Sequence, residues 1–208
     1  MRSMPSGGQP TPYPADPKSA VADVLAHRVR VLSLAQIART WFSEAADPRG
    51  GARRLAQALQ RRGSVESVKL MARPEIMPDR PLVTWQPGLP QPDLGPVAWT
   101  LRKRRRDQAP VATPCLLAAT GRHPRPTDTT HDLHLAAVFL LMCKEMPTRA
   151  CSWVFEDDLI RPGQKLPDAL VTDGRAKTAI ECGGEYDRQR LQEDHNYFAR
   201  KGYGYEIW

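Results

Sequence analysis

The stretch from residue 167 to residue 184 constrains the fold most strongly, because it predicts a β-hairpin. Two runs rich in Val, Ile, Thr and Ala flank Asp173-Gly174, a pair that favours a type I′ turn since both central residues can adopt a positive φ. A two-residue turn at this pair places Asp168 opposite Ala179. Because strand side chains alternate between faces, Glu181 then lies on the same face as Asp168.

Asp168 and Glu181 are predicted to be diagonal neighbours across this hairpin, roughly 7–8 Å apart at the backbone. Two carboxylates at that spacing can reach one ion, and hard cations such as Mg²⁺ are held by one or two carboxylates plus water or phosphate oxygens. The pair therefore predicts a divalent-metal site, although the solvated face of a surface hairpin can carry the same two residues.

The charge balance narrows the class of partner. The 208 residues include 30 Lys and Arg against 23 Asp and Glu, which gives a net charge of +7. Such an excess suits a phosphate backbone or another polyanion, and double-stranded DNA is the partner we expect. A chain of this length can form two small domains.

No stretch of the sequence predicts export or membrane insertion. The longest apolar run, around residues 135–143, is far shorter than the roughly 18–20 residues that a spanning helix needs. The first residues lead into Gly and Pro instead of an apolar signal segment. The four cysteines lack Cys-x-x-Cys spacing, which argues against a zinc site or a disulfide framework. We therefore expect a cytoplasmic protein with no membrane partner.

The N-terminal half predicts a tail followed by a small helical domain. Residues 1–17 are rich in Pro, Gly and Ser and predict a disordered tail. Helical periodicity then predicts three helices, from residue 18 to about 32, from 34 to 42 with Ser33 as the N-cap, and from about 52 to 62. Two short strands follow at residues 65–71 and 82–85. Three helices followed by a hairpin with a basic loop resemble a winged helix-turn-helix domain, here residues 18–86.

In that family the third helix enters the major groove and the hairpin loop lies along the backbone. The resemblance implies that residues of the third helix contact bases or phosphates and that flanking basic residues position the protein on DNA. The first group is Arg53, Arg54 and Gln57, with Arg61 on the same outward side; the second group is Arg49, Lys69, Arg73 and Arg80. A basic helix of this kind can also be a solvated face.

Residues 87–128 predict a Pro-rich, basic connection between domains. Prolines interrupt any regular pattern there, and a loop of this length is uncommon inside one compact domain. The basic run at residues 102–106 is either a second phosphate contact or a solvated linker.

The C-terminal half predicts the element order αβββαβ. A helix begins near residue 130, a strand follows at 151–155, then the hairpin, a helix at about 187–201 and a last strand at 203–208. This order, with Pro167-Asp168 opening one strand and Glu181 on the next, resembles the PD-(D/E)XK nuclease superfamily. Together with the winged helix, it resembles the replication-relaxation family, which includes MOBC-type plasmid relaxases. The predicted fold class is α+β, an N-terminal winged helix-turn-helix followed by a PD-(D/E)XK-like αβββαβ domain at residues 129–208.

The resemblance implies that Asp168 and Glu181 are catalytic residues that bind Mg²⁺, which activates water and stabilises charge on the phosphate. The lysine that normally stands two residues beyond the Glu is replaced by Gly183. Lys177 shares the face but lies about 13 Å along the strand. The remaining basic candidates are Lys165, Arg188 and Arg190.

Three hypotheses for function follow. The first is a DNA-binding protein that acts on plasmid or mobile-element DNA in replication or mobilisation, with a second copy of the chain or a relaxosome or replication protein as candidate partner. The second is a Mg²⁺-dependent nicking endonuclease or relaxase. The third is a winged-helix transcriptional regulator. His131 and His134 have an i, i+3 spacing that can bind metal, but without a third ligand this pair is more typical of polar residues near a helix N-terminus.

Overall fold

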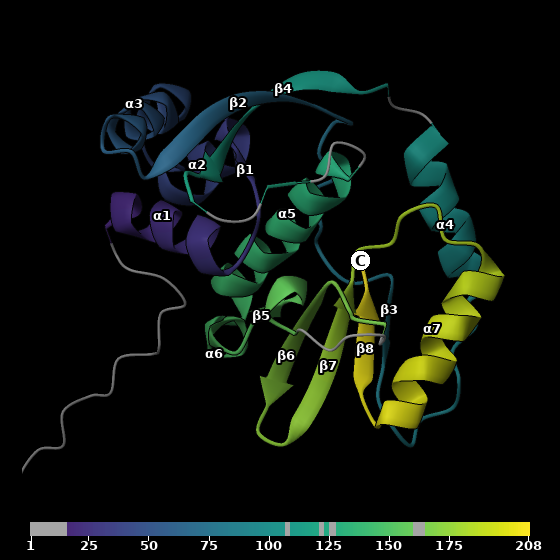
Figure 1. Cartoon of the computed structure of the whole chain (residues 1–208). Coiled ribbons are helices and arrows are strands. Elements are labelled where there is room, and N and C mark those ends of the chain that lie inside the picture. Colours follow the sequence, from purple (N-terminus) through teal and green to yellow (C-terminus); the bar gives the residue numbers. More distant parts are fainter. Residues whose placement is uncertain (1–15, 107–108, 121–122, 125–127, 160–164) are drawn as a thin grey trace, which may run out of the picture.

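The computed structural model is a mixed α+β structure with two β-sheets (Figure 1). It describes residues 16–106, 109–120, 123–124, 128–159 and 165–208. Of the expected N-terminal tail, residues 1–15 lie outside the described residues. Asp16 and Pro17, in contrast, already belong to the first helix, because the Asp16 side chain accepts a hydrogen bond from Ser19 N and acts as the N-cap.

Three helices open the chain, α1 (Pro17–His27), α2 (Leu34–Trp41) and α3 (Pro48–Arg61). The predicted N-cap of α2 is confirmed: Ser33 Oγ accepts from Gln36 N at 3.0 Å, and Ser33 N donates to Gln36 Oε1 at 2.9 Å, which completes a capping box. The predicted start of α3 near residue 52 is wrong. The helix begins at Pro48 because Asp47 caps Gly50 N at 2.8 Å and proline is well suited to the first helical turn.

The first sheet has three strands, β1 (Leu32–Ser33), β2 (Val65–Ala72) and β4 (Val111–Ala118), in the order β1-β4-β2. Both neighbours of the central β4 are antiparallel to it, and the β2–β4 register runs from Val65 opposite Ala118 to Ala72 opposite Val111. The long two-stranded ribbon beside α3 is therefore built from strands that lie far apart in the sequence.

This pairing corrects the expected hairpin of residues 65–71 and 82–85. The second of those segments forms β3 (Val83–Trp85), which pairs antiparallel with β8 (Gly204–Ile207) in the other sheet. Trp85 is buried there, with its ring stacked 5.6 Å from that of Tyr205. Burial of this aromatic ring against the second sheet gives the physical reason why the strand leaves its neighbour in sequence.

Residues 87–128 are not the irregular connection that their prolines predict. They contain α4 (Gly95–Arg106) as well as β4. The loop between the two strands of the first sheet thus carries β3 and α4 over to the second sheet, and β4 returns to complete the first (Figure 1). The expected boundaries at residues 86 and 128 therefore do not separate the two sheets.

The second sheet has the strand order β3-β8-β7-β6-β5. Its additional strands are β5 (Val154–Phe155), β6 (Ala169–Asp173) and β7 (Ala176–Glu181), and only the β7–β8 pair is parallel. The helices around it are α5 (Thr129–Glu145), α6 (Pro147–Cys151), the short 3-10 helix η1 (Glu156–Asp158) and α7 (Arg188–Lys201). The expected αβββαβ segments form helices and strands, but the strand expected at residues 151–155 is reduced to Val154–Phe155 because residues 147–151 form α6. The short helix η1 follows it, and β3 is added at one edge of the sheet.

Helices cover both faces of this sheet. One face, with Ile180 and Cys182, packs in the same core as α5, whereas the other, with Ala179 and Tyr205, packs with α4 and α7. Because side chains alternate along β7, Glu181 belongs to the side of Ala179. The end of β7 therefore lies where α4, α5 and α7 meet the sheet.

Candidate functional site

The two carboxylates expected to act together lie directly opposite each other at one end of the hairpin. The strand register pairs Ala169 with Ile180, so that Asp168, one residue earlier, faces Glu181. The predicted diagonal arrangement is wrong because the turn falls one residue later than expected, at Gly174-Arg175. Gly174 has a φ of 58°, which glycine adopts without steric cost at the first central position of a hairpin turn.

Asp168 is held by two partners from different elements. Its Oδ2 atom accepts a hydrogen bond from Cys182 N at 2.7 Å and lies 3.0 Å from His131 Nε2 in the first turn of α5. Burial lowers the pKa of His131, but the charge of Asp168 and hydrogen bonds to Asp132 and Asp168 outweigh it and raise this pKa to about 10. His131 is therefore an imidazolium that neutralises Asp168 and joins α5 to the sheet.

Glu181 is the most enclosed carboxylate of the site. It is 3% exposed, and within the described part of the chain its buried Oε1 atom has no hydrogen-bond partner. Burial raises its pKa well above the usual value, the nearby charge of Asp168 raises it further, and Lys165, His131 and Arg190 act in the opposite direction. An unpartnered buried carboxylate oxygen is costly, which marks this position as a candidate ligand site.

Gly183, two residues beyond Glu181, packs closely against α4. A Cβ atom added to Gly183 would lie 2.4 to 3.0 Å from side-chain carbons of Leu101 on α4. Leu101 itself is 2% exposed. A side chain at this position would therefore force the Leu101 side chain to shift.

Lys165 is the lysine that the structure brings near the carboxylates. Burial lowers its pKa and the charges of Glu181 and Asp168 raise it, so its ammonium group lies within electrostatic range of both. Its Nζ atom contacts Asp194 Oδ1 on α7, and Arg190 Nε lies 3.4 Å from the same oxygen. Arg188, the other basic candidate, is exposed.

The sequence did not indicate His131 or Asp194 as members of this cluster. The i, i+3 spacing of His131 and His134 gives no sign of Asp168, because the contact of His131 with Asp168 joins residues 37 positions apart. Asp194 does carry a usable signal: it lies three residues after buried Leu191 and four before buried Phe198, on the apolar stripe of α7 where an acid needs a partner.

The donor set fits a hard divalent cation only in part. Two opposed carboxylates with one unpartnered oxygen suit Mg²⁺, but no group of three or more His, Cys, Asp or Glu side chains that could hold a metal occurs in the described ranges. Asp168 and Glu181 would therefore hold Mg²⁺ together with water or phosphate oxygens. His131 and His134 do not form a metal pair with them.

The residues expected to contact DNA fall into two environments. Most of them are exposed, on α3, on β2 or in the segment between β2 and β3: Arg49, Arg53, Arg54, Gln57, Arg61, Lys69 and Arg80. Arg54 also lies 3.8 Å from Asp47 in an exposed ion pair. Arg73 differs, since it is partly buried and its backbone N–H donates to Thr130 Oγ1 at 3.0 Å, which places it against α5. Arg80 precedes β3 and so does not lie in the loop of a hairpin.

A membrane-span search and three comparisons with known proteins complete the description of the chain. In the part of the chain that the structure describes, no helix combines the length and apolar character needed to cross a membrane. Comparison with known protein families, with curated proteins and with solved structures finds no match to this chain.

Proposed function

We propose that this chain is a DNA-binding protein of the replication-relaxation type, with a winged helix-turn-helix at its N-terminus and a PD-(D/E)XK nuclease-like unit at its C-terminus. It acts on plasmid or mobile-element DNA in replication or mobilisation. The order of three helices and two long antiparallel strands supports the winged helix, with β2 and β4 as the wing. The carboxylate pair on adjacent strands supports the nuclease-like unit.

The exposed basic side of α3 is the observation that carries the proposal. Leu55 and Leu59 on one side of this helix are buried in the core, whereas Arg53, Arg54 and Arg61 are exposed on the other. An arginine-rich helix with a free side can enter the major groove and contact phosphates bidentately. Lys69 extends the positive surface onto β2.

Binding to a short duplex, measured by fluorescence anisotropy over a salt series, tests this proposal. The triple variant Arg53→Gln, Arg54→Gln, Arg61→Gln should bind more weakly, and the slope of log K against log salt should fall by about 1 for each lost phosphate contact. Arg175→Gln, at the hairpin turn, is the matched control and should change neither quantity. Equal slopes for the wild type and the triple variant would contradict the proposed DNA surface.

A Mg²⁺-dependent nicking endonuclease is the second candidate, and the buried oxygen of Glu181 favours it. Bound between Asp168 and Glu181, Mg²⁺ would supply Lewis-acid activation of water and phosphate. Lys165 and Arg190 would offset negative charge at the site. Because the pKa of Glu181 is raised, this carboxyl group can hold a proton until a cation displaces it.

Incubation of supercoiled plasmid with Mg²⁺ or Mn²⁺ distinguishes the candidates. The nuclease hypothesis predicts relaxation that Asp168→Asn and Glu181→Gln abolish while duplex affinity is kept. Duplex binding without relaxation supports the DNA-binding function and a non-catalytic nuclease-like unit. Sequence-specific binding near a promoter, again without nicking, would instead favour a transcriptional regulator.

A further inference from the structure

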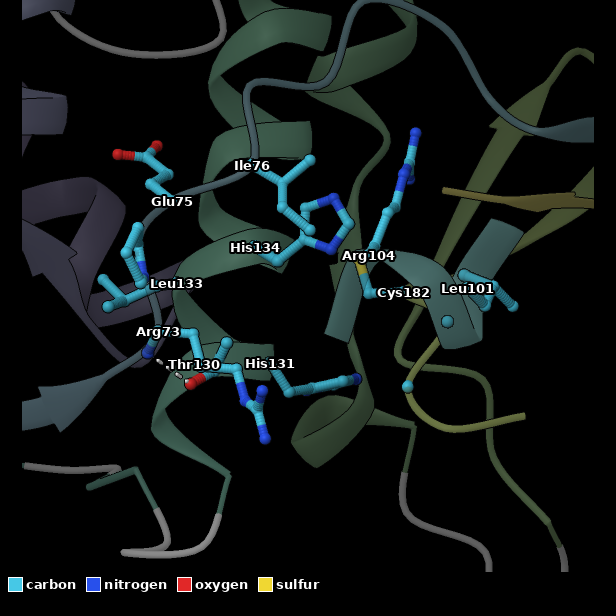
Figure 2. Close-up of a pocket in the computed structure, with 13 residues that line it drawn as sticks. Arg73, Glu75, Ile76, Leu101, Arg104, Thr130, His131, Leu133, His134 and Cys182 are labelled. Atoms are coloured by element: carbon cyan, nitrogen blue, oxygen red, sulfur yellow. Dashed lines mark hydrogen bonds between the residues drawn. The ribbon is translucent and has the colours of Figure 1, made fainter. Parts of the chain in front are cut away.

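A small cavity of about 40 Å³ lies beside the carboxylate site, and four basic side chains are among the residues that line it. It is enclosed by the segment that follows β2, by α4, by the first two turns of α5 and by residues 182–184. Figure 2 shows Arg104 and His134 in the upper part of this view and Arg73 and His131 in the lower part. The cavity thus lies where the segments that follow β2 and β7 meet α4 and α5.

His134 presents an unpartnered nitrogen at this cavity. The residue is 9% exposed, and its buried Nε2 atom has no hydrogen-bond partner in the described ranges. Burial lowers the pKa of His134 to about 4, and the positive charges of Arg104 and His131 contribute to the shift. The ring is therefore neutral near pH 7 and can present an N–H group to a ligand.

Arg104 is the second polar group that the cavity presents. It is partly buried, and in the described part of the chain it makes no hydrogen bond or ion pair. Burial lowers its pKa, and the charge of Asp79 offsets this only in part. Glu75, the acid that lines the cavity, is paired with Arg39 Nη2 at 2.6 Å. The acid that lines the cavity therefore does not neutralise Arg104.

We propose that this cavity binds a single phosphate group, held by Arg104 and His134. A guanidinium and an imidazole N–H give charge-assisted hydrogen bonds to phosphate oxygens. The cavity has room for a group of that size but not for a nucleoside. The phosphate comes either from solution or from DNA, and only the second source rests on the proposed function.

Isothermal titration with inorganic phosphate, at constant ionic strength against chloride, tests the site without DNA. The wild type should bind phosphate, and Arg104→Met, which keeps the aliphatic stem, should weaken binding at least about tenfold. Arg102→Met, an exposed neighbour on the same helix, is the matched control and should change affinity less than about twofold. No binding by the wild type, or equal loss in both variants, would overturn the proposal.

His134→Leu provides an independent variant and should also weaken phosphate binding. Because His134 is buried, circular dichroism checks that the His134→Leu variant folds. If it does not fold, Arg104→Met decides the outcome.

Short oligonucleotides with and without a 5′-phosphate then identify the source of the bound phosphate. A preference for the 5′-phosphate that Arg104→Met removes assigns the site to DNA ends, and equal binding of both oligonucleotides assigns it to free phosphate. Failure of the α3 variants to affect duplex binding would leave the phosphate result intact.

Discussion

Arg30 is the buried cation that connects the N-terminal helices to the second sheet. It is 7% exposed and lies in the loop between α1 and β1. Its guanidinium reaches Asp132 on α5 at 3.2 Å and, on η1, Glu156 at 2.5 Å and Asp157 at 2.7 Å. The charged group also lies 4.8 Å from the centroid of the Phe155 ring. One side chain thus joins three segments through charge and packing.

Replacing Arg30 should destabilise the protein more than replacing a surface arginine does. Arg30→Met leaves Asp132, which is 2% exposed, without its guanidinium, and loss of one partner of a buried ion pair costs about 3–5 kcal/mol. Arg39→Met is the control, because the Arg39 side chain is 42% exposed in its pair with Glu75. This substitution should lower the free energy of unfolding by less than about 1 kcal/mol. Urea denaturation followed by circular dichroism measures the free energy of unfolding of both variants. Equal losses of stability would contradict the structural role of the Arg30 ion pairs.

The residues of the carboxylate site differ in how far the sequence predicts them. Asp168 and Glu181 follow from strand alternation around a single turn, and even a one-residue error in the turn left them on one face. His131 and Lys165 come from other segments and reach the site only through packing. Periodicity predicts on which face of a helix or strand a side chain lies. It does not predict which distant element packs against that face.

At the scale of elements, the sequence predicts the existence of strands better than their partners. The segments at residues 65–71 and 82–85 are both strands, yet they lie in different sheets. A hydrophobic pattern specifies which face of a strand is buried, but it does not specify which other strand pairs with it. The eight-residue ladder between β2 and β4 satisfies more backbone hydrogen bonds than a pairing of β2 with three-residue β3 could offer.

The contact between α4 and β7 predicts a measurable coupling. Gly183→Ala should destabilise the protein by about 1–3 kcal/mol, because the new methyl group meets the side chain of Leu101. Leu101→Ala alone should cost about 2–5 kcal/mol through the cavity it leaves. In the double variant the two changes should compensate by at least about 1 kcal/mol in a double-mutant cycle of urea stabilities. Strict additivity would show that α4 does not exclude a side chain from position 183.

Across the whole molecule, the two sheets share one hydrophobic core. A single cluster of buried residues includes Val21 of α1, Leu55 of α3, Phe139 of α5 and Val171 of β6. The chain also passes from the first sheet to the second and back between β2 and β4. Both observations indicate that the N-terminal helices and the second sheet unfold together.

A fragment of residues 18–86, the winged-helix unit expected from the sequence, should therefore not fold alone. It lacks β4, the central strand of the first sheet and the partner of both β1 and β2. It also loses the contacts of α5 with the shared core. We expect narrow amide dispersion in its NMR spectrum and no cooperative thermal transition. A fragment of residues 18–118 restores β4 and should regain part of the strand signal in circular dichroism. A cooperative transition in the shorter fragment would show instead that the three helices are stable without their central strand, in which case β4 adds to a domain that is already formed.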